Sequence, residues 1–181
     1  WFFGEKCVFK NIPRISDTYK TVDALTSLGC SVRFIDKNSI EVECADIFSS
    51  EIPLEAMSAR QSVLFVGATL ARTGKVIIYP PRGDAIGKRP INRHLEGIKA
   101  LGGTVKETNN FMEISMPKRP KSTVYTFEKN THCGTENLIL ASVFNDGKVV
   151  LKNAAEEPEV DNLIDCLNSM GAKIKRTEPR V

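Results

Sequence analysis

Apolar residues recur at the spacing of an amphipathic helix in three separate segments of the chain. In each segment they lie three or four positions apart, as expected when one face of a helix packs against a core. Each set is followed directly by a glycine, a residue that readily takes the left-handed conformation closing a helix. The pattern therefore predicts three helices that end before Gly29, Gly102 and Gly171. The apolar sets are Val22, Leu25 and Leu28; Leu95, Ile98 and Leu101; and Val160, Leu163, Leu167 and Met170.

The three closing glycines are separated by 73 and 69 residues, an interval regular enough to indicate a repeated unit. Each predicted helix is preceded and followed by short β-rich strands, with "VIIY" and "VVLK" as the clearest examples. Two further stretches, from about 54 to 74 and from about 135 to 147, are apolar around much of their circumference. Such stretches predict buried helices between the units.

These units predict one α/β domain over residues 1–181, with pseudo-threefold symmetry, buried helices inside and sheets outside. The first unit covers about 5–74, the second about 75–147, and the third, truncated unit about 148–181. The period exceeds that of the common solenoids, which favours a closed set of three units. The chain begins without Met and stops just after a predicted strand, so we expect both ends to be truncations.

The composition is that of an ordinary globular domain. Hydrophobic residues make up 41% of the chain and charged residues 26%. The net charge of +3 is too small to indicate nucleic-acid binding, and no apolar run approaches the roughly 18 residues of a membrane span. The five cysteines are scattered and lie mostly in apolar surroundings, which predicts buried, reduced thiols and a cytosolic compartment.

The loop between strand and helix is longer in the second unit than in the other two. It reads "YPPRGDAIGKRPINRH" and places Arg89 and Pro90 at a predicted helix N-terminus, where free N–H groups and the helix dipole favour an anion. A solvated basic loop is the alternative interpretation. The asymmetry between otherwise similar units favours a functional loop. Its charged or titratable residues are Arg82, Asp84, Lys88, Arg89, Arg93 and His94.

The stretch "EKNTHCGTEN" (128–137) precedes the second buried helix and is another candidate anion site. Lys129, Thr131 and a turn at Gly134 would together form a cradle of donors at a helix start. The alternative is a helix that is simply capped by Thr135.

Arg60 and the two histidines raise separate questions. Arg60 lies in a predicted apolar helix, where it must bind a charge or a ligand, or else extend its guanidinium to solvent. The neighbouring His132 and Cys133 match no metal-site spacing, and the chain has only one further histidine. We therefore predict no metal and no cofactor.

Four stretches carry the ordered pattern of a known enzyme family. "RGDAIGKRPINRHLEGIKALGGTV" matches G-[CD]-x-I-G-x-R-P-[VI]-[DN]-x-H and a following helix, and "ARQSVLFVGATLARTGK" matches R-x-S-x-x-x-x-G-x-x-x-A-R-x-G. "KNTHCGTENLILASV" looks like K-x-S-V-G-A-T-E-N, and "KNAAEEPEVDNLIDCLNSMGAKI" is close to E-N-A-A-x-E-P-E-[IV]-x-D-L. The chain thus resembles the UDP-N-acetylglucosamine 1-carboxyvinyltransferase (MurA, enolpyruvyl transferase) family over essentially its whole length. The resemblance implies an inside-out α/β barrel-like domain of the EPSP synthase/MurA type, whose partner domain is absent from this chain.

The resemblance also implies roles for individual residues. Asp84 stands where the family usually has cysteine and sometimes aspartate, the general acid that protonates the methylene carbon of phosphoenolpyruvate. Arg89 matches an arginine at the phosphate and nucleotide site, and Arg60 matches a substrate-site arginine. "NR" at 92–93 and "NTHCGT" replace the family's Asp-Leu and "VSVGAT". The positions that match nucleotide-sugar-binding residues are Pro90, Ile91, Asn92, Arg93, Lys129, Asn130, Thr131 and His132.

The implied reaction transfers enolpyruvyl from phosphoenolpyruvate to the 3'-hydroxyl of UDP-N-acetylglucosamine and releases phosphate. In the family this is the first committed step of bacterial peptidoglycan synthesis and takes place in the cytoplasm. The implied partners are the two substrates and a second domain of the same enzyme, with no nucleic acid and no membrane. The family's Lys-Asn pair and the acidic base of the other domain have no counterpart here. An alternative of another class is a non-catalytic remnant that keeps the fold and binds a nucleotide sugar.

Overall fold

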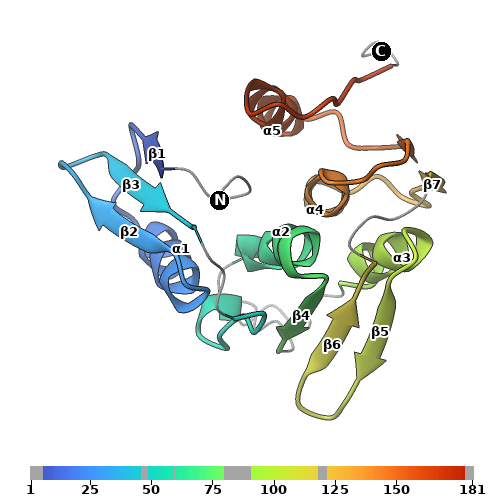
Figure 1. The fold of residues 1–181 in the computed structure, drawn as a ribbon, viewed down its shortest axis with the longest axis horizontal. Coiled ribbons are helices and arrows are strands. Elements are labelled where there is room, and N and C mark those ends of the chain that lie inside the picture. The colour runs from blue at the N-terminus through green and yellow to red at the C-terminus, as the bar shows by residue number, and fades with distance from the viewer. Residues whose placement is uncertain (1–5, 46–48, 59, 80–90, 118–121, 178–181) are drawn as a thin grey trace.

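The computed structural model describes residues 6–45, 49–58, 60–79, 91–117 and 122–177, with the side chains of residues 58, 60 and 61 outside this description. The fold is α/β. Helices α2 (Leu64–Thr73) and α4 (His132–Ser142) lie at the centre, and small sheets lie around them (Figure 1). This inside-out arrangement confirms the predicted fold class. None of the described helices is long and apolar enough to cross a membrane.

The first unit forms a three-stranded antiparallel sheet and one helix. Helix α1 (Ser16–Ser27) closes where the sequence predicts, at Gly29, whose φ is 103°. The sheet has the order β1-β3-β2. Its strands are β1 (Lys6–Phe9), β2 (Ser31–Phe34) and β3 (Ile40–Glu43).

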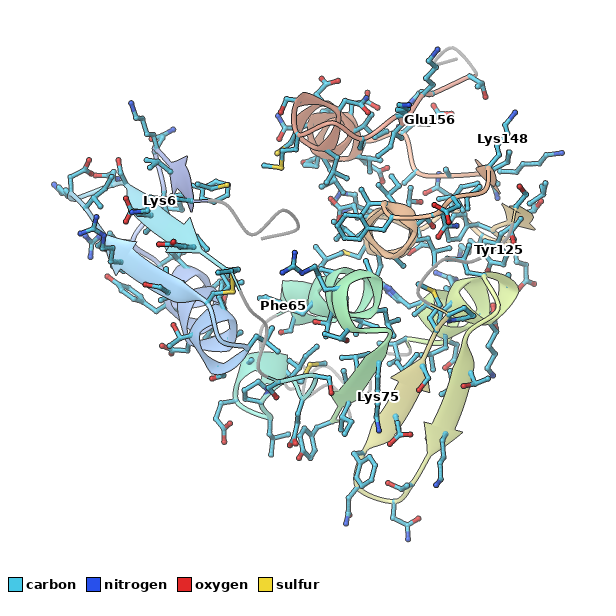
Figure 2. The ribbon with its side chains drawn as sticks, viewed as in Figure 1. Lys6, Phe65, Lys75, Tyr125, Lys148 and Glu156 are labelled. Carbon is cyan, nitrogen blue, oxygen red and sulfur yellow. A yellow bond between two sulfur atoms is a disulfide. The ribbon has the colours of Figure 1, made fainter. Side chains whose placement is uncertain are left out.

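In this unit, two of the chain's five cysteines form a disulfide. This finding corrects the prediction of five reduced thiols. Cys30 and Cys44 are bonded through sulfur, and both are buried (Figure 2). Ser31 pairs with Glu43 in the antiparallel register of β2 and β3, so the residues just outside this pair face each other. Their Cα atoms lie 4.3 Å apart, within bonding reach of two cysteines. The cysteines therefore no longer indicate a cytosolic compartment.

The predicted helix from 54 to 74 is divided into three short elements. Two 3-10 turns, η1 (Ala56–Ser58) and η2 (Arg60–Val63), precede the regular helix α2. The Ser62 hydroxyl donates to the carbonyl oxygen of Ala56. Such side-chain to backbone bonding competes with regular helical bonding and gives a physical reason for the interruption. The helix ends as predicted at Gly74, with φ of 75°.

The second unit repeats the sheet order of the first. Strand β4 (Lys75–Ile78) and strand β5 (Thr104–Glu107) both pair antiparallel with the central strand β6 (Met112–Ser115). Helix α3 (Asn92–Ala100) packs its apolar face inward, with Ile98 fully buried, and the chain turns at Gly102. The long loop at residues 80–90 lies outside the described residues.

The third unit departs from this pattern. Strand β7 (Thr123–Thr126) pairs parallel with β8 (Val149–Lys152), and helix α5 (Pro158–Ser169) follows. The strand predicted after Gly171 does not form within the described residues. The backbone of Ile174 instead bonds the side-chain amide of Asn168, which donates to its carbonyl oxygen at 2.9 Å and accepts from its N–H at 2.8 Å. The backbone of Ile174 thus bonds to a side chain and not to a neighbouring strand.

The central helices approach each other through glycine. A Cβ atom at Gly67 of α2 would lie 2.2 Å from the carbonyl oxygen of Asn137 in α4. A Cβ atom at Gly97 of α3 would lie 2.3 Å from Cδ1 of Leu138. Contacts this short are excluded for real atoms, so α2 and α3 pack against α4 only because these positions lack a side chain. The second predicted buried helix, from 135 to 147, begins three residues earlier than expected and ends at Ser142.

Candidate functional site

The N-terminal halves of three helices meet at one buried side chain, Asn137. Its Oδ1 accepts a hydrogen bond of 2.6 Å from the backbone N–H of Gly67 in α2. Its Nδ2 lies 3.0 Å from Nδ1 of His94 in α3. Asn137 has no exposed surface, and His94 is 8% exposed. The side-chain amide of Asn137 therefore connects α4 to α2 and to α3.

The amide of Asn137 also fixes the protonation state of His94. Because Oδ1 accepts from Gly67, the amide must present its N–H donors to Nδ1 of His94, which can accept only when unprotonated. Burial, and to a smaller extent the nearby positive charge of Arg93, lower the pKa of His94 to about 4. The sequence interpretation of His94 as part of a charged loop is therefore wrong: it is a neutral residue of the core.

The predicted substrate residues near α3 lie at or before its first turn. Ile91 is the N-cap residue and is buried, whereas Asn92 and Arg93 are exposed in the first turn. Asp84, Arg89 and Pro90 fall outside the described residues, and so does the side chain of Arg60, whose backbone begins η2. Their contacts are therefore not described.

The second predicted stretch lies directly before and at the start of α4. Lys129 and Asn130 are exposed, and Asn130 Nδ2 donates to the carbonyl oxygen of Ala154 at 3.3 Å. Thr131 is the N-cap, and its hydroxyl oxygen accepts from the N–H of Gly134 at 3.4 Å. The alternative of Thr135 as the cap is wrong, because Thr135 lies within the helix.

Thr135 instead connects the start of α4 to the loop after β8. Its hydroxyl donates to the Thr131 carbonyl oxygen and accepts from the N–H of Ala155, both at 2.9 Å. Asn153, with a φ of 53°, donates from its side chain to the carbonyl oxygen of Phe127. The loop "KNAAEE" is thus bonded to the stretch 127–135 through Asn153 and Ala155.

Three helix N-termini consequently gather around Asn137. Gly67 is the fourth residue of α2, His94 the third of α3 and Asn137 the sixth of α4. At 1.5 Å per residue, these positions lie about 5, 3 and 8 Å from the start of their helices. The helix dipole gives each N-terminus a partial positive charge, which favours an anionic ligand. The exposed cations Arg93 and Lys129 add to this field.

Another cluster occupies the first turns of α4. Donor atoms of His132, Cys133 and Glu136 all lie within 4.8 Å of one another. The Glu136 carboxylate is 3.5 Å from Nε2 of His132, and Glu136 is only 9% exposed. Burial raises the pKa of Glu136, an effect that the nearby His132 opposes.

Sequence reasoning did not single out Gly67, Glu136 or Asn137. All three lie inside the quoted motifs, at positions that read as helix interior. A buried asparagine and a buried glutamate in an otherwise apolar helix were the signals that could have drawn attention to them, because such groups require polar partners.

Comparison with known proteins identifies the family. The family model described as "EPSP synthase (3-phosphoshikimate 1-carboxyvinyltransferase)" matches residues 3–181. The chain belongs to this family. Its members in the comparison include UDP-N-acetylglucosamine 1-carboxyvinyltransferases from Hydrogenovibrio crunogenus and Dichelobacter nodosus, each 39% identical, over 92% and 93% of this chain. A third, from Clostridium acetobutylicum, is 39% identical over 97% of this chain.

Solved structures share the fold of this chain. The enolpyruvyl transferase NikO from Streptomyces tendae matches 98% of this chain with a TM-score of 0.82 at 14% identity. EPSP synthase from Acinetobacter baumannii matches 94% of it with a TM-score of 0.71, also at 14% identity. The chain spans 40 to 42% of the three curated relatives and 42% and 39% of these two structures.

Proposed function

We propose that this chain is one domain of a UDP-N-acetylglucosamine 1-carboxyvinyltransferase. In this role it would take part in moving the enolpyruvyl group of phosphoenolpyruvate to the 3'-hydroxyl of the nucleotide sugar, with a cytoplasmic location. The observation that carries the proposal is the 39% identity to relatives of that name over nearly the whole chain. The gathering of three helix N-termini beside Arg93 and Lys129 supports it, because both substrates carry phosphate.

The chemistry requires an acid beside an anion. The sugar hydroxyl forms a C–O bond with the central carbon of phosphoenolpyruvate, and a proton is delivered to the neighbouring methylene carbon. The C–O bond to phosphate then breaks as a proton leaves the new methyl group, which restores the double bond. In our proposal Asp84 delivers the first proton, since a nearby phosphate dianion raises the pKa of a carboxyl group into the working range. Arg89 and Arg60 stabilise the phosphate charge.

In this proposal, the described side chains hold the starts of α3 and α4 in position. His94 and Asn137 hold the start of α3 against α4, and Asn130 and Thr131 hold the start of α4 against the loop at 153–155. Arg93 and Lys129 remain exposed at the two helix starts. A nucleotide diphosphate would therefore meet pre-arranged N–H donors and two cations at little cost in reorganisation.

Binding of the nucleotide sugar tests this arrangement in the chain itself. Arg93→Ala and Lys129→Ala are each expected to weaken binding of UDP-N-acetylglucosamine about tenfold, because each removes a charge-assisted contact to phosphate. Isothermal titration calorimetry measures the change. Lys106→Ala is the matched control, because Lys106 is an exposed cation on β5 and its removal should leave affinity unchanged. Equal affinities in all three variants would contradict the proposed site.

Turnover separates the enzyme from the non-catalytic alternative. We expect no phosphate release from phosphoenolpyruvate and UDP-N-acetylglucosamine by these 181 residues alone, because they span 40% of a curated relative and the proposed cleft lies between two domains. Addition of the complementary domain of a curated relative should restore release, and Asp84→Ala should abolish it. Release that survives Asp84→Ala contradicts the role of Asp84. Sugar binding without release in the reconstituted protein would establish the non-catalytic alternative.

The carboxylate at position 84 also predicts a pattern of inhibition. A thiol-alkylating epoxide such as fosfomycin should leave position 84 unmodified, because an aspartate cannot form the thioether adduct that a cysteine forms. Asp84→Cys is expected to acquire the adduct. Peptide mass spectrometry locates the modification and distinguishes it from reaction at the exposed Cys166. Labelling of Asp84 itself would contradict the prediction.

A further inference from the structure

We propose that His132, Cys133 and Glu136 form a binding site for a divalent transition-metal ion of the Zn²⁺ type at the start of α4. Their donor atoms, an imidazole nitrogen, a sulfur and a carboxylate oxygen, all lie within 4.8 Å of one another. No other group of three such residues is this close in the part of the chain that the structure describes. The proposal is independent of the function proposed above.

The distance between His132 and Glu136 fits a bridging ion. Zinc lies about 2.0–2.1 Å from a histidine nitrogen and about 2.0–2.2 Å from a carboxylate oxygen, so tetrahedral geometry separates the two ligand atoms by about 3.4 Å. The separation between Nε2 of His132 and Oε1 of Glu136 is 3.5 Å. The Sγ of Cys133 would need to move by about 1 Å at most to reach the corresponding separation of about 3.6 Å.

Burial supplies a second, independent observation. Nε2 of His132 is enclosed, yet it has no hydrogen-bond partner among the described residues. The carboxylate that it faces belongs to a residue only 9% exposed. An enclosed ring nitrogen without a hydrogen bond is costly, and a cation between it and the Glu136 carboxylate would bind both groups.

The choice of donors selects the class of ion. Imidazole and thiolate are ligands for zinc, cobalt and related ions, whereas magnesium and calcium prefer an all-oxygen shell. Three protein ligands leave a fourth position for water or for an anionic oxygen. His132 and Cys133 stand where the motif K-x-S-V-G-A-T-E-N has Val and Gly, so two of the three donors depart from that motif.

Cobalt titration of the metal-free chain, with the Cys30–Cys44 disulfide intact and Cys133 as the thiol, tests the site. Co²⁺ should bind at one ion per chain with a thiolate-to-metal absorption band, and Zn²⁺ should displace it. Cys133→Ala should remove the band, and His132→Val and Glu136→Gln should each weaken binding at least about tenfold, since even residues that only orient ligands have effects of that size. The double variant Cys7→Ser/Cys166→Ser is the matched control and should bind like the unmodified chain, because it keeps Cys133 and the Cys30–Cys44 pair.

Measurements on the unmodified chain can contradict the proposal even if a variant fails to fold. Absence of a thiolate band on Co²⁺ addition, or binding of magnesium in preference to zinc, contradicts the site. A band that persists in folded Cys133→Ala, checked by circular dichroism, assigns the ion to another cysteine and also contradicts it. Loss of binding in the double control variant would have the same meaning.

Discussion

Replacing Gly67 with alanine is expected to lower the free energy of unfolding by about 3 kcal/mol. The added Cβ would lie 2.2 Å from the carbonyl oxygen and 2.4 Å from Oδ1 of Asn137. The carbonyl belongs to the backbone of α4, so the contact cannot be relieved by rotating a side chain. The two central helices must move apart, which also strains the hydrogen bond from Gly67 to Asn137. For a domain of this size the loss corresponds to a fall in Tm of roughly 6–12 °C, measurable by thermal and urea denaturation.

Gly97→Ala is the informative comparison. Its added Cβ would meet the side chain of Leu138, 2.3 Å from Cδ1, and a smaller residue there removes the obstacle. We expect Gly97→Ala/Leu138→Ala to lose less stability than the sum of the two single variants. Gly67→Ala/Asn137→Ala should retain the clash with the carbonyl oxygen. A Gly67→Ala protein within about 1 kcal/mol of the unmodified chain would contradict the close packing of α2 and α4.

Acidification from pH 6.5 to pH 4 is expected to remove about 3 kcal/mol of stability through His94 alone. Burial lowers its pKa from 6.5 to about 4 in the folded state. Between these values the unfolded chain binds a proton that the folded chain does not, so the free energy of unfolding falls as the pH falls. The stabilisation is complete above pH 6.5 and lost by about pH 4. A proton on Nδ1 would also remove the acceptor that Asn137 requires.

His94→Gln isolates this contribution. Glutamine does not titrate, and its carbonyl oxygen can accept a hydrogen bond from the amide of Asn137. The variant keeps His132, the only other histidine of the chain, and all the carboxylates, so their titrations cancel in the difference between the two proteins. Urea denaturation at a series of pH values gives the two curves. Parallel curves between pH 4 and 6.5 would show that His94 is not the buried, neutral residue described above.

The sequence predicted a large part of the fold because the signals are local. Apolar spacing marks the face of one helix, and Gly29, Gly102 and Gly171 all take the positive φ expected of a closing residue. The interruption of the helix before α2 was missed, because the bond from Ser62 to Ala56 competes with a pattern that otherwise reads as continuous helix. The strand after Gly171 was predicted from its residues, but strand assignment also requires a neighbour to pair with.

The candidate site was predicted less completely. The motifs indicated which segments to inspect, and they placed Lys129 and Thr131 at a helix start, where the structure has them. They assigned Arg93 to a loop, whereas it lies in the first turn of α3. His94 was assigned to the charged loop, because it follows several basic residues in the sequence. Its burial depends on how α3 packs against α4, and no spacing within the loop records that contact.

What the sequence by itself determined is most of the helices and strands, the closing glycines and the family to which the chain belongs. The tertiary structure decided which residues meet. Asn137 bonds partners 43 and 70 positions away, and Cys30 reaches Cys44 only through the register of two strands. The physical reason is that periodicity describes one element at a time. A contact between elements depends instead on the packing of whole surfaces, here on helices brought together where glycine leaves room.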